Sequence, residues 1–205
     1  MKSNILLTSL ASLLVVSGAN ATEYKPFVGA TMGFQGVTYS SEIEDAARDS
    51  SLNLPDNFFT FGLEGGIRYG AHSAIYNGGF TINVDTTTGS NIEDKFTDAK
   101  FAEVKTFNMS ATYDNYFRIS GDKIKRIDLV LGAGVGTMNY DIDYKNNMID
   151  DETVWSPMLA FKVGLDFEMT QNLTLSATTR LFTPTRSHYW MHSTYVFGGA
   201  IKYMF

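Results

Sequence analysis

The chain has 205 residues, no cysteine and a formal net charge of −6 at neutral pH. The lack of cysteine excludes a small secreted domain held together by disulfides. The acidic balance argues against a nucleic-acid-binding protein, which needs a basic surface. The length suits one domain with a sizeable core or one small barrel.

The first 21 residues have the pattern of a secretory signal peptide. Lys2 supplies positive charge, residues 5–16 are mostly apolar, and Ala19 and Ala21 are small residues at the positions that signal peptidase reads. The apolar stretch is too short to cross about 30 Å of hydrocarbon as a helix. We therefore predict a cleaved signal peptide over residues 1–21 and one mature domain over residues 22–205.

After the signal peptide, side chains alternate between apolar and polar with a period of two, which indicates strands rather than helices. Eight segments show this pattern, and each is long enough for a tilted strand that crosses a membrane. In chain order the predicted strands are 27–37, 58–69, 74–85, 101–119, 126–138, 155–169, 173–182 and 194–205. Pro26 and Pro157 lie at predicted strand starts and Pro55 and Pro184 in connections, so no proline interrupts a strand centre.

The connections between these strands alternate between short and long. Short ones cover 70–73, 120–125 and 170–172, and long ones cover 38–57, 86–100, 139–154 and 183–193. Outer-membrane barrels have short periplasmic turns and longer extracellular loops. The alternation therefore predicts an all-β fold, an eight-stranded antiparallel up-and-down transmembrane barrel.

The two faces of the predicted strands differ in polarity. A barrel in hydrocarbon turns its apolar face to lipid and pairs every backbone group internally, so we expect the polar face to line the interior. The charged residues predicted there are Glu64, Arg68, Asp128, Lys162, Asp166, Glu168, Arg180 and Lys202. Both signs are present and can pair, and an eight-stranded interior is just wide enough for side chains to fill. A soluble carrier barrel, the alternative, would place the apolar face inside.

Aromatic residues gather near the predicted strand ends, where they are expected to form girdles at the membrane interfaces. They are Phe27, Phe58, Phe59, Tyr69, Tyr113, Phe117, Trp155, Tyr195, Tyr203 and Phe205. The last predicted strand carries Phe197, Ile201, Tyr203 and Phe205 in an alternating pattern. This pattern resembles the C-terminal signal that the barrel assembly machinery reads, so we expect that machinery to be a partner.

Two further segments carry a family resemblance. The glycine-rich stretch 129–136 is similar to the fifth strand of a known superfamily, and residues 161–180, with 164–167 and 172–175, resemble its sixth strand, tight turn and seventh strand. This is the outer-membrane β-barrel superfamily that includes opacity-type surface proteins and the transmembrane domain of outer membrane protein A. The resemblance covers essentially all of residues 22–205 and implies residence in the outer membrane of a Gram-negative bacterium.

Two groups of loop residues could carry chemistry. Ser187, His188, His192 and Ser193 lie in the last long connection, where a histidine beside a serine could activate a nucleophile. The spacing expected of lipopolysaccharide deacylases is absent, so a polar exposed loop is the preferred interpretation. Acidic residues of the other long connections could bind Ca²⁺ or Mg²⁺, but they lack EF-hand spacing, and a solvated face is again preferred.

These observations predict an integral outer-membrane surface protein with a structural, adhesion or surface-interaction role through its extracellular loops. We expect no catalysis and no cofactor. The expected partners are outer-membrane lipid and lipopolysaccharide, the assembly machinery, and a host or surface ligand at the loops. A small porin-like channel is the first alternative, and a lipid A-modifying enzyme is the second.

Overall fold

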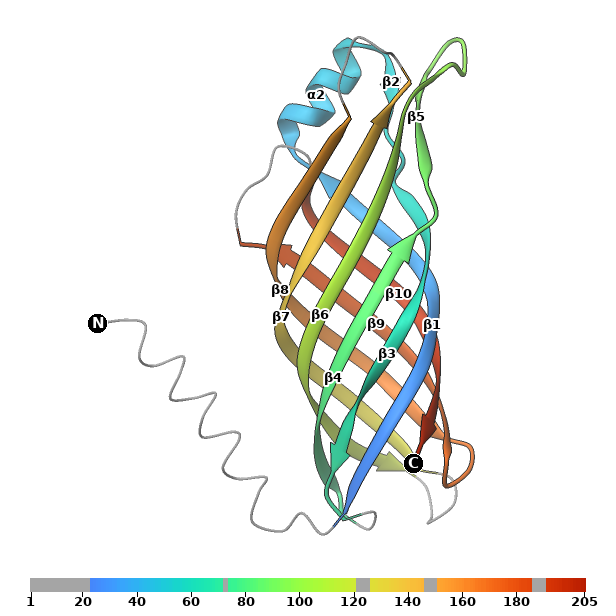
Figure 1. The fold of residues 1–205 in the computed structure, drawn as a ribbon, viewed down its shortest axis with the longest axis vertical. Coiled ribbons are helices and arrows are strands. Elements are labelled where there is room, and N and C mark those ends of the chain that lie inside the picture. Colours follow the sequence, from blue (N-terminus) through green and yellow to red (C-terminus); the bar gives the residue numbers. More distant parts are fainter. Residues whose placement is uncertain (1–22, 72–73, 121–125, 146–150, 186–190) are drawn as a thin grey trace, which may run out of the picture.

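The computed structural model describes residues 23–71, 74–120, 126–145, 151–185 and 191–205. Eight long antiparallel strands form the wall of a barrel (Figure 1). They are β1 (Tyr24–Tyr39), β3 (Asn57–Tyr69), β4 (Tyr76–Thr87), β6 (Lys100–Ser120), β7 (Ile127–Tyr144), β8 (Glu152–Glu168), β9 (Leu173–Pro184) and β10 (Met191–Met204). The predicted signal peptide lies outside the described residues.

The wall closes because β1 pairs with β3 on one side and with β10 on the other. The β1–β10 register runs from Phe27 opposite Met204 to Tyr39 opposite Met191. The remaining long strands each pair with their neighbours in chain order. The prediction of an eight-stranded up-and-down barrel is therefore confirmed. In the described part of the chain, no helix is long and apolar enough to cross a bilayer.

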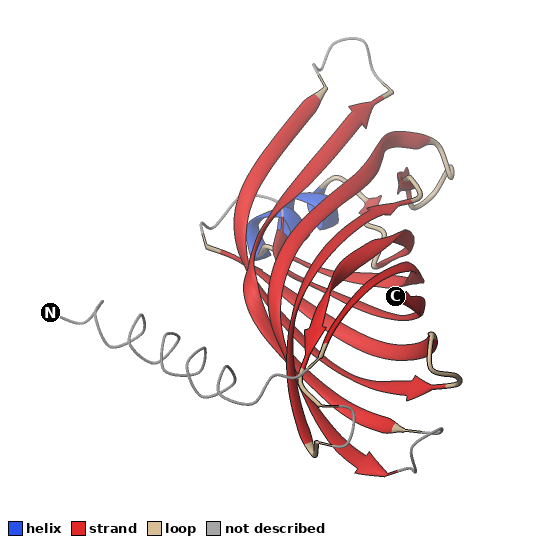
Figure 2. Cartoon of the chain, turned by 60° about the horizontal axis from the view of Figure 1, so that its bottom comes forward, coloured by secondary structure: helices blue, strands red, loops and turns tan. Residues whose placement is uncertain are grey.

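One end of the barrel carries additional structure that the sequence pattern did not predict. The connection after β1 contains the helix α2 (Ser41–Asp49) and the short strand β2 (Leu52–Asn53), and the connection after β4 contains β5 (Ser90–Asp94). Strand β5 pairs with both β2 and β6. Figures 1 and 2 show α2 at this end, away from the short turns. We call this the α2 end, and the opposite one the turn end.

Helix α2 forms because its charges suit its termini. Glu42 and Glu44 lie in the first turn and Arg48 in the last, which favours the helix dipole at both ends. Ala47 is buried, and Ile43 packs against the apolar core inside the barrel. The helix therefore lies on the barrel with one face inward and its charged residues outward.

Several strands continue beyond their predicted ends, and for β8 this corrects the placement of Pro157. Strand β8 begins at Glu152, so Pro157 lies inside the strand rather than at its start. Its carbonyl accepts a hydrogen bond from Thr185 N–H at 2.9 Å. The last β8–β9 pair is Met158 opposite Pro184. Pro157 therefore lies where β9 ends, so the missing proline N–H affects only the end of the β8–β9 ladder.

Side chains alternate across the wall as the period of two requires. On β1, Met32 and Phe34 point outward and are about three-fifths exposed, whereas Thr31 and Gln35 point inward and are buried. The aromatic prediction needs a correction, because Phe27 and Phe58 are 3% and 2% exposed inside the barrel. Both share the inward face of their strands with residues predicted to be interior, so alternation overrides the preference of aromatics for an interface.

Candidate functional site in the barrel interior and cap

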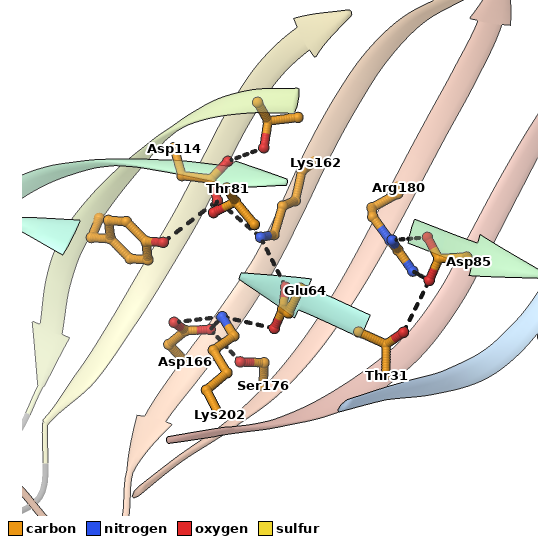
Figure 3. Close-up of polar contacts among 12 residues, drawn as sticks. Thr31, Glu64, Thr81, Asp85, Asp114, Lys162, Asp166, Ser176, Arg180 and Lys202 are labelled. Atoms are coloured by element: carbon orange, nitrogen blue, oxygen red, sulfur yellow. Dashed lines mark hydrogen bonds and ion pairs between the residues drawn. The ribbon is translucent and has the colours of Figure 1, made fainter. Parts of the chain in front are cut away.

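A chain of ion pairs crosses the middle of the barrel interior (Figure 3). Lys162 Nζ donates to Asp114 Oδ2 at 2.9 Å, and Lys202 Nζ donates to both Asp166 oxygens at 3.0 Å. Glu64 lies between the two lysines, 3.8 Å from Lys162 and 3.6 Å from Lys202. The chain therefore joins β3, β6, β8 and β10 through their side chains.

Hydroxyl groups complete the hydrogen bonding of the two aspartates in this network. Thr81 and Thr112 donate to Asp114 at 2.7 and 2.8 Å, and Ser176 donates to Asp166 at 2.6 Å. Gly132 faces Asp114 from β7, where a Cβ atom would collide with the carboxylate. A buried carboxylate is tolerated when its lone pairs are satisfied, and this arrangement meets that condition.

A second pair lies nearer the α2 end. Arg180 of β9 makes two hydrogen bonds to Asp85 of β4, and Thr31 donates to the same carboxylate at 2.9 Å. The two strands are on opposite sides of the ring, and Figure 3 shows the pair beside the lysine network. A bidentate contact between arginine and carboxylate is among the stronger pairs in proteins, so it ties the two walls together.

A third group fills the turn end. Arg68 and Arg126 both contact Asp128, and Arg68 also lies 3.5 Å from Glu168. The Arg68 guanidinium lies 4.4 Å from the centre of the Tyr116 ring, a cation–π distance. A cavity of about 20 Å³ opens at this mouth, beside Arg68 and Glu168. It has room for about one water molecule.

The structure brings the predicted interior charges together and adds three more. Glu64, Arg68, Asp128, Lys162, Asp166, Arg180 and Lys202 are buried, and the Glu168 side chain is 14% exposed at the mouth. Asp85, Asp114 and Arg126 are buried members of this set that were not predicted. Asp85 and Asp114 occupy the same alternating positions as the polar residues before them, so the period of two was the signal that could have found them.

The buried charges of the described interior balance. Five acidic and five basic side chains are buried there. They are Glu64, Asp85, Asp114, Asp128 and Asp166, with Arg68, Arg126, Lys162, Arg180 and Lys202. Each has an oppositely charged partner within 4.0 Å. The buried charges of the interior are therefore paired within the protein.

Above this polar region the interior becomes apolar, which corrects the prediction of a polar interior throughout. A last polar layer joins Gln35, Thr106 and Asn108 through hydrogen bonds of 2.8 and 2.9 Å. Toward the α2 end follows an apolar core of buried side chains from seven long strands and β5. It contains Val37, Tyr39, Phe58, Ile92, Ala102, Val104, Met138, Tyr140, Ile142, Met158, Ala160, Phe182 and Val196, and Ile43, Leu52 and Leu54 pack against it.

At the same height along the barrel axis, the outer face of the wall changes from apolar to charged. On β7, Leu131 and Val135 are exposed and apolar, whereas Asp141 farther along the same face is exposed and charged. Lys105 of β6 pairs in register with Asp141, and its ammonium lies 3.1 Å from Glu103. We call the described residues 40–57, 88–105, 137–145 and 151–156 the cap. The cap is apolar inside and charged outside, as a protein in water is.

The turn between β5 and β6 is held in one shape by Asp94. Its carboxylate accepts hydrogen bonds from Phe96 N–H at 2.9 Å, Thr97 N–H at 2.8 Å and the Thr97 hydroxyl at 2.9 Å. Asp98 N–H donates to the Asp94 carbonyl at 3.0 Å, and Asp98 has a φ of 54°. Lys95 N–H donates to Ser51 just after α2, which fixes the turn beside the helix.

Acidification is expected to loosen this turn. The Phe96 backbone N–H, followed by the Thr97 hydroxyl and N–H, lowers the pKa of Asp94 below its usual range. A lowered folded-state pKa gives stability that is present above the ordinary value of about 3.9 and lost as the pH falls through the lowered value. Protection of the Phe96 and Thr97 amides against hydrogen exchange, relative to an unstructured peptide at the same pH, should therefore decrease below about pH 4. In an Asp94→Ala variant the protection should be low at every pH, and wild-type protection that does not change with pH would contradict this account.

The structure describes only some of the loop residues that could carry catalysis. His192 is exposed and adjoins Ser193 on β10, whereas Ser187 and His188 lie outside the described residues. Among the described residues, no group of three histidine, cysteine or acidic side chains is placed to hold a metal ion.

Comparison with known proteins identifies the family. The sequence profile of the outer membrane protein β-barrel domain matches residues 8–203. The chain belongs to this family. It is therefore an outer-membrane protein, and its apolar outer belt faces lipid. Barrels of this kind turn their short connections to the periplasm, so the cap faces the cell exterior. None of the curated protein sequences matches the chain.

Solved structures show the same fold at low sequence identity. Neisserial surface protein A is 12% identical with a TM-score of 0.53, and the match covers 91% of this chain and 99% of that protein. OprG from Pseudomonas aeruginosa is 15% identical with a TM-score of 0.53, over 89% and 97%. The N-terminal barrel of Pseudomonas aeruginosa OprF is 11% identical with a TM-score of 0.52, over 89% and 100%. These similarities establish the fold and leave the specific role open.

Proposed function

We propose that this protein is a closed, non-catalytic outer-membrane barrel whose function is a surface interaction made by its cap. The observation that carries the proposal is the filled interior. Ten buried charges are paired across the lower interior, and the apolar core of the cap lies above them. A solute would have to break ion pairs and also enter an apolar core, and both steps are costly.

The construction of the cap supports a role in binding. Loops usually vary and move, whereas residues positioned by a rigid scaffold are suited to recognition. Here α2, β2 and β5 are packed on the apolar core or paired to the wall. The Tyr39 hydroxyl donates to Pro55 O at 2.8 Å, and Val37 N–H donates to Asp56 O at 3.1 Å. The barrel therefore presents an ordered surface to the exterior.

A narrow channel is the second candidate, and one observation favours it. The amide of Asn83 is buried, and neither its nitrogen nor its oxygen has a hydrogen-bond partner in the described structure. Asn108 Oδ1 is unpartnered in the same part of the interior. Buried polar groups of this kind commonly form hydrogen bonds with water, so we expect water molecules beside these two amides. Water there would still be separated from the exterior by the apolar core.

Conductance measurements test the closed interior. The mature protein, folded as shown by heat-modifiable gel migration, should give no discrete current steps in planar lipid bilayers. Steps whose size changes in a Lys162→Ala variant would show that the interior conducts and would overturn the proposal.

The surface role is measured on cells. Cells that display the protein should attach to protein-coated surfaces more than cells that lack it, and an antibody fragment against α2 should remove the difference. Equal attachment with and without the protein would remove the support for a surface interaction.

A further inference from the structure

Charge is segregated along the barrel axis. Among the described residues, the cap carries thirteen acidic and five basic side chains, a net charge of −8. The acidic residues are Glu42, Glu44, Asp45, Asp49, Asp56, Glu93, Asp94, Asp98, Glu103, Asp141, Asp143, Asp151 and Glu152, and the basic ones are Arg48, Lys95, Lys100, Lys105 and Lys145. The other described residues contain seven of each sign and are neutral. The cap therefore holds the whole negative charge of the described chain.

Much of this charge has no local compensation. In α2, Arg48 lies 3.4 Å from Asp45, but within the described chain no lysine or arginine forms an ion pair with Glu42, Glu44 or Asp49. All three are exposed. Like charges on one short helix repel one another, and an oppositely charged partner would relieve that repulsion.

A second and independent feature lies next to the helix. Phe96 is 84% exposed at the tip of the turn that Asp94 orders. It lies in the cap rather than on the lipid-facing belt, so water surrounds the ring in the free protein. Because Asp94 and the Lys95–Ser51 bond fix the turn, the ring is held out at little further entropic cost. Ordered, exposed aromatic residues are common anchors of protein interfaces.

We infer that the cap binds a basic polypeptide, with Phe96 entering an apolar pocket of that partner and the acidic residues of α2 facing its lysines and arginines. This inference rests on the proposed surface function and specifies the partner of the same surface. The negative field disfavours sulfated polysaccharides and other polyanions, since like charge opposes their approach. Lipopolysaccharide phosphates could approach through bridging divalent cations, which the experiment separates from a polypeptide.

The test uses the full mature protein in lipid nanodiscs. The probes are a labelled peptide of alternating lysine and leucine, an oligoglutamate peptide, and vesicles that contain lipopolysaccharide with Mg²⁺. The lysine–leucine peptide should bind, the oligoglutamate should not, and binding should weaken as salt rises, because the Debye length shortens from about 10 Å at 0.1 M to 3 Å at 1 M.

Variants separate the two features. Neutralising α2 with Glu42→Gln, Glu44→Gln and Asp49→Asn should weaken peptide binding about tenfold, since each exposed pair contributes a fraction of a kcal/mol. Phe96→Ser should weaken it by about tenfold or more. The matched control is Ile75→Ser, which removes an apolar side chain that is 73% exposed at the periplasmic end and should have no effect. Heat-modifiable migration should be unchanged in all of them.

Two outcomes would overturn the inference. In one, the peptide binds equally to the wild type and to both cap variants. In the other, the wild type binds the lipopolysaccharide vesicles, EDTA abolishes that binding, and the α2 variant loses it. That result would assign the surface to cation-bridged lipopolysaccharide. Either result leaves the proposed function standing if attachment still requires the cap. Discrete current steps would overturn the proposed function whatever the peptide does.

Discussion

Replacing Asp85 with alanine is expected to lower the free energy of unfolding of the barrel by about 3–5 kcal/mol. Arg180 is 5% exposed and makes both of its described carboxylate contacts with Asp85. The substitution would leave a guanidinium charge buried without its partner. Urea unfolding in phospholipid vesicles, followed by tryptophan fluorescence, measures the loss.

Two comparisons make this prediction specific. The double variant Asp85→Ala, Arg180→Met should recover much of the lost stability, because removing both charges relieves the unpaired one. On the surface, Asp45→Ala should change stability by less than about 1 kcal/mol, since the Asp45–Arg48 pair is 66% and 73% exposed. A double variant no more stable than Asp85→Ala would show that the loss comes from something other than the unpaired charge.

The second large effect is the loss of stability when lysine is introduced on the outer face of β7. Part of that face contacts lipid and part of it, in the cap, contacts water. Leu131→Lys on β7 should destabilise the barrel by about 2–4 kcal/mol, because Leu131 lies in the middle of the lipid-facing apolar row. Asp141→Lys, on the same face of the same strand in the cap, should cost only about 1 kcal/mol or less, because it loses the Thr153 hydrogen bond and faces Lys105, but does so in water. The measurement is again urea unfolding in vesicles.

A lysine on the inward face of β7 in the cap should have the opposite outcome to Asp141→Lys. Ile142 is 0% exposed in the apolar core of the cap, so Ile142→Lys buries an unpaired charge and should open the cap. Equal effects of lysine at positions 131 and 141 would show that the outer face experiences one environment along its length. The boundary that we place between lipid and water would then be wrong.

Some interior positions could be predicted from particular residues of the sequence. Alternation on residues 159–168 put Lys162 and Asp166 on the face opposite Phe161 and Leu165, and the structure places both charges inside. The same rule, applied to Asp85 and Asp114, would have found the missed aspartates. The pairs themselves were not readable, because Asp85 and Arg180 are 95 residues apart and meet across the ring.

The cap shows where a single periodic rule fails. Apart from the inward-facing Val130, the apolar residues of β7 have odd numbers up to Val135 and even numbers at Met138, Tyr140 and Ile142. The strand does not slip, because its register with β6 continues without a break through Met138 and Tyr140. What changes is the surroundings: hydrocarbon favours apolar residues outside, and water favours them inside. This reversal was visible in the sequence but was assigned to a loop.

The sequence alone determined the strands, the alternation of short and long connections, the barrel and the membrane that surrounds it. These depend on local pattern and on the requirement that backbone groups in lipid be paired. The tertiary structure alone decided which charges meet, that α2 and β5 pack against an apolar core at the outer end, and that Phe96 is exposed beside an acidic helix. Those features arise from contacts between segments far apart in the chain, which no local period encodes.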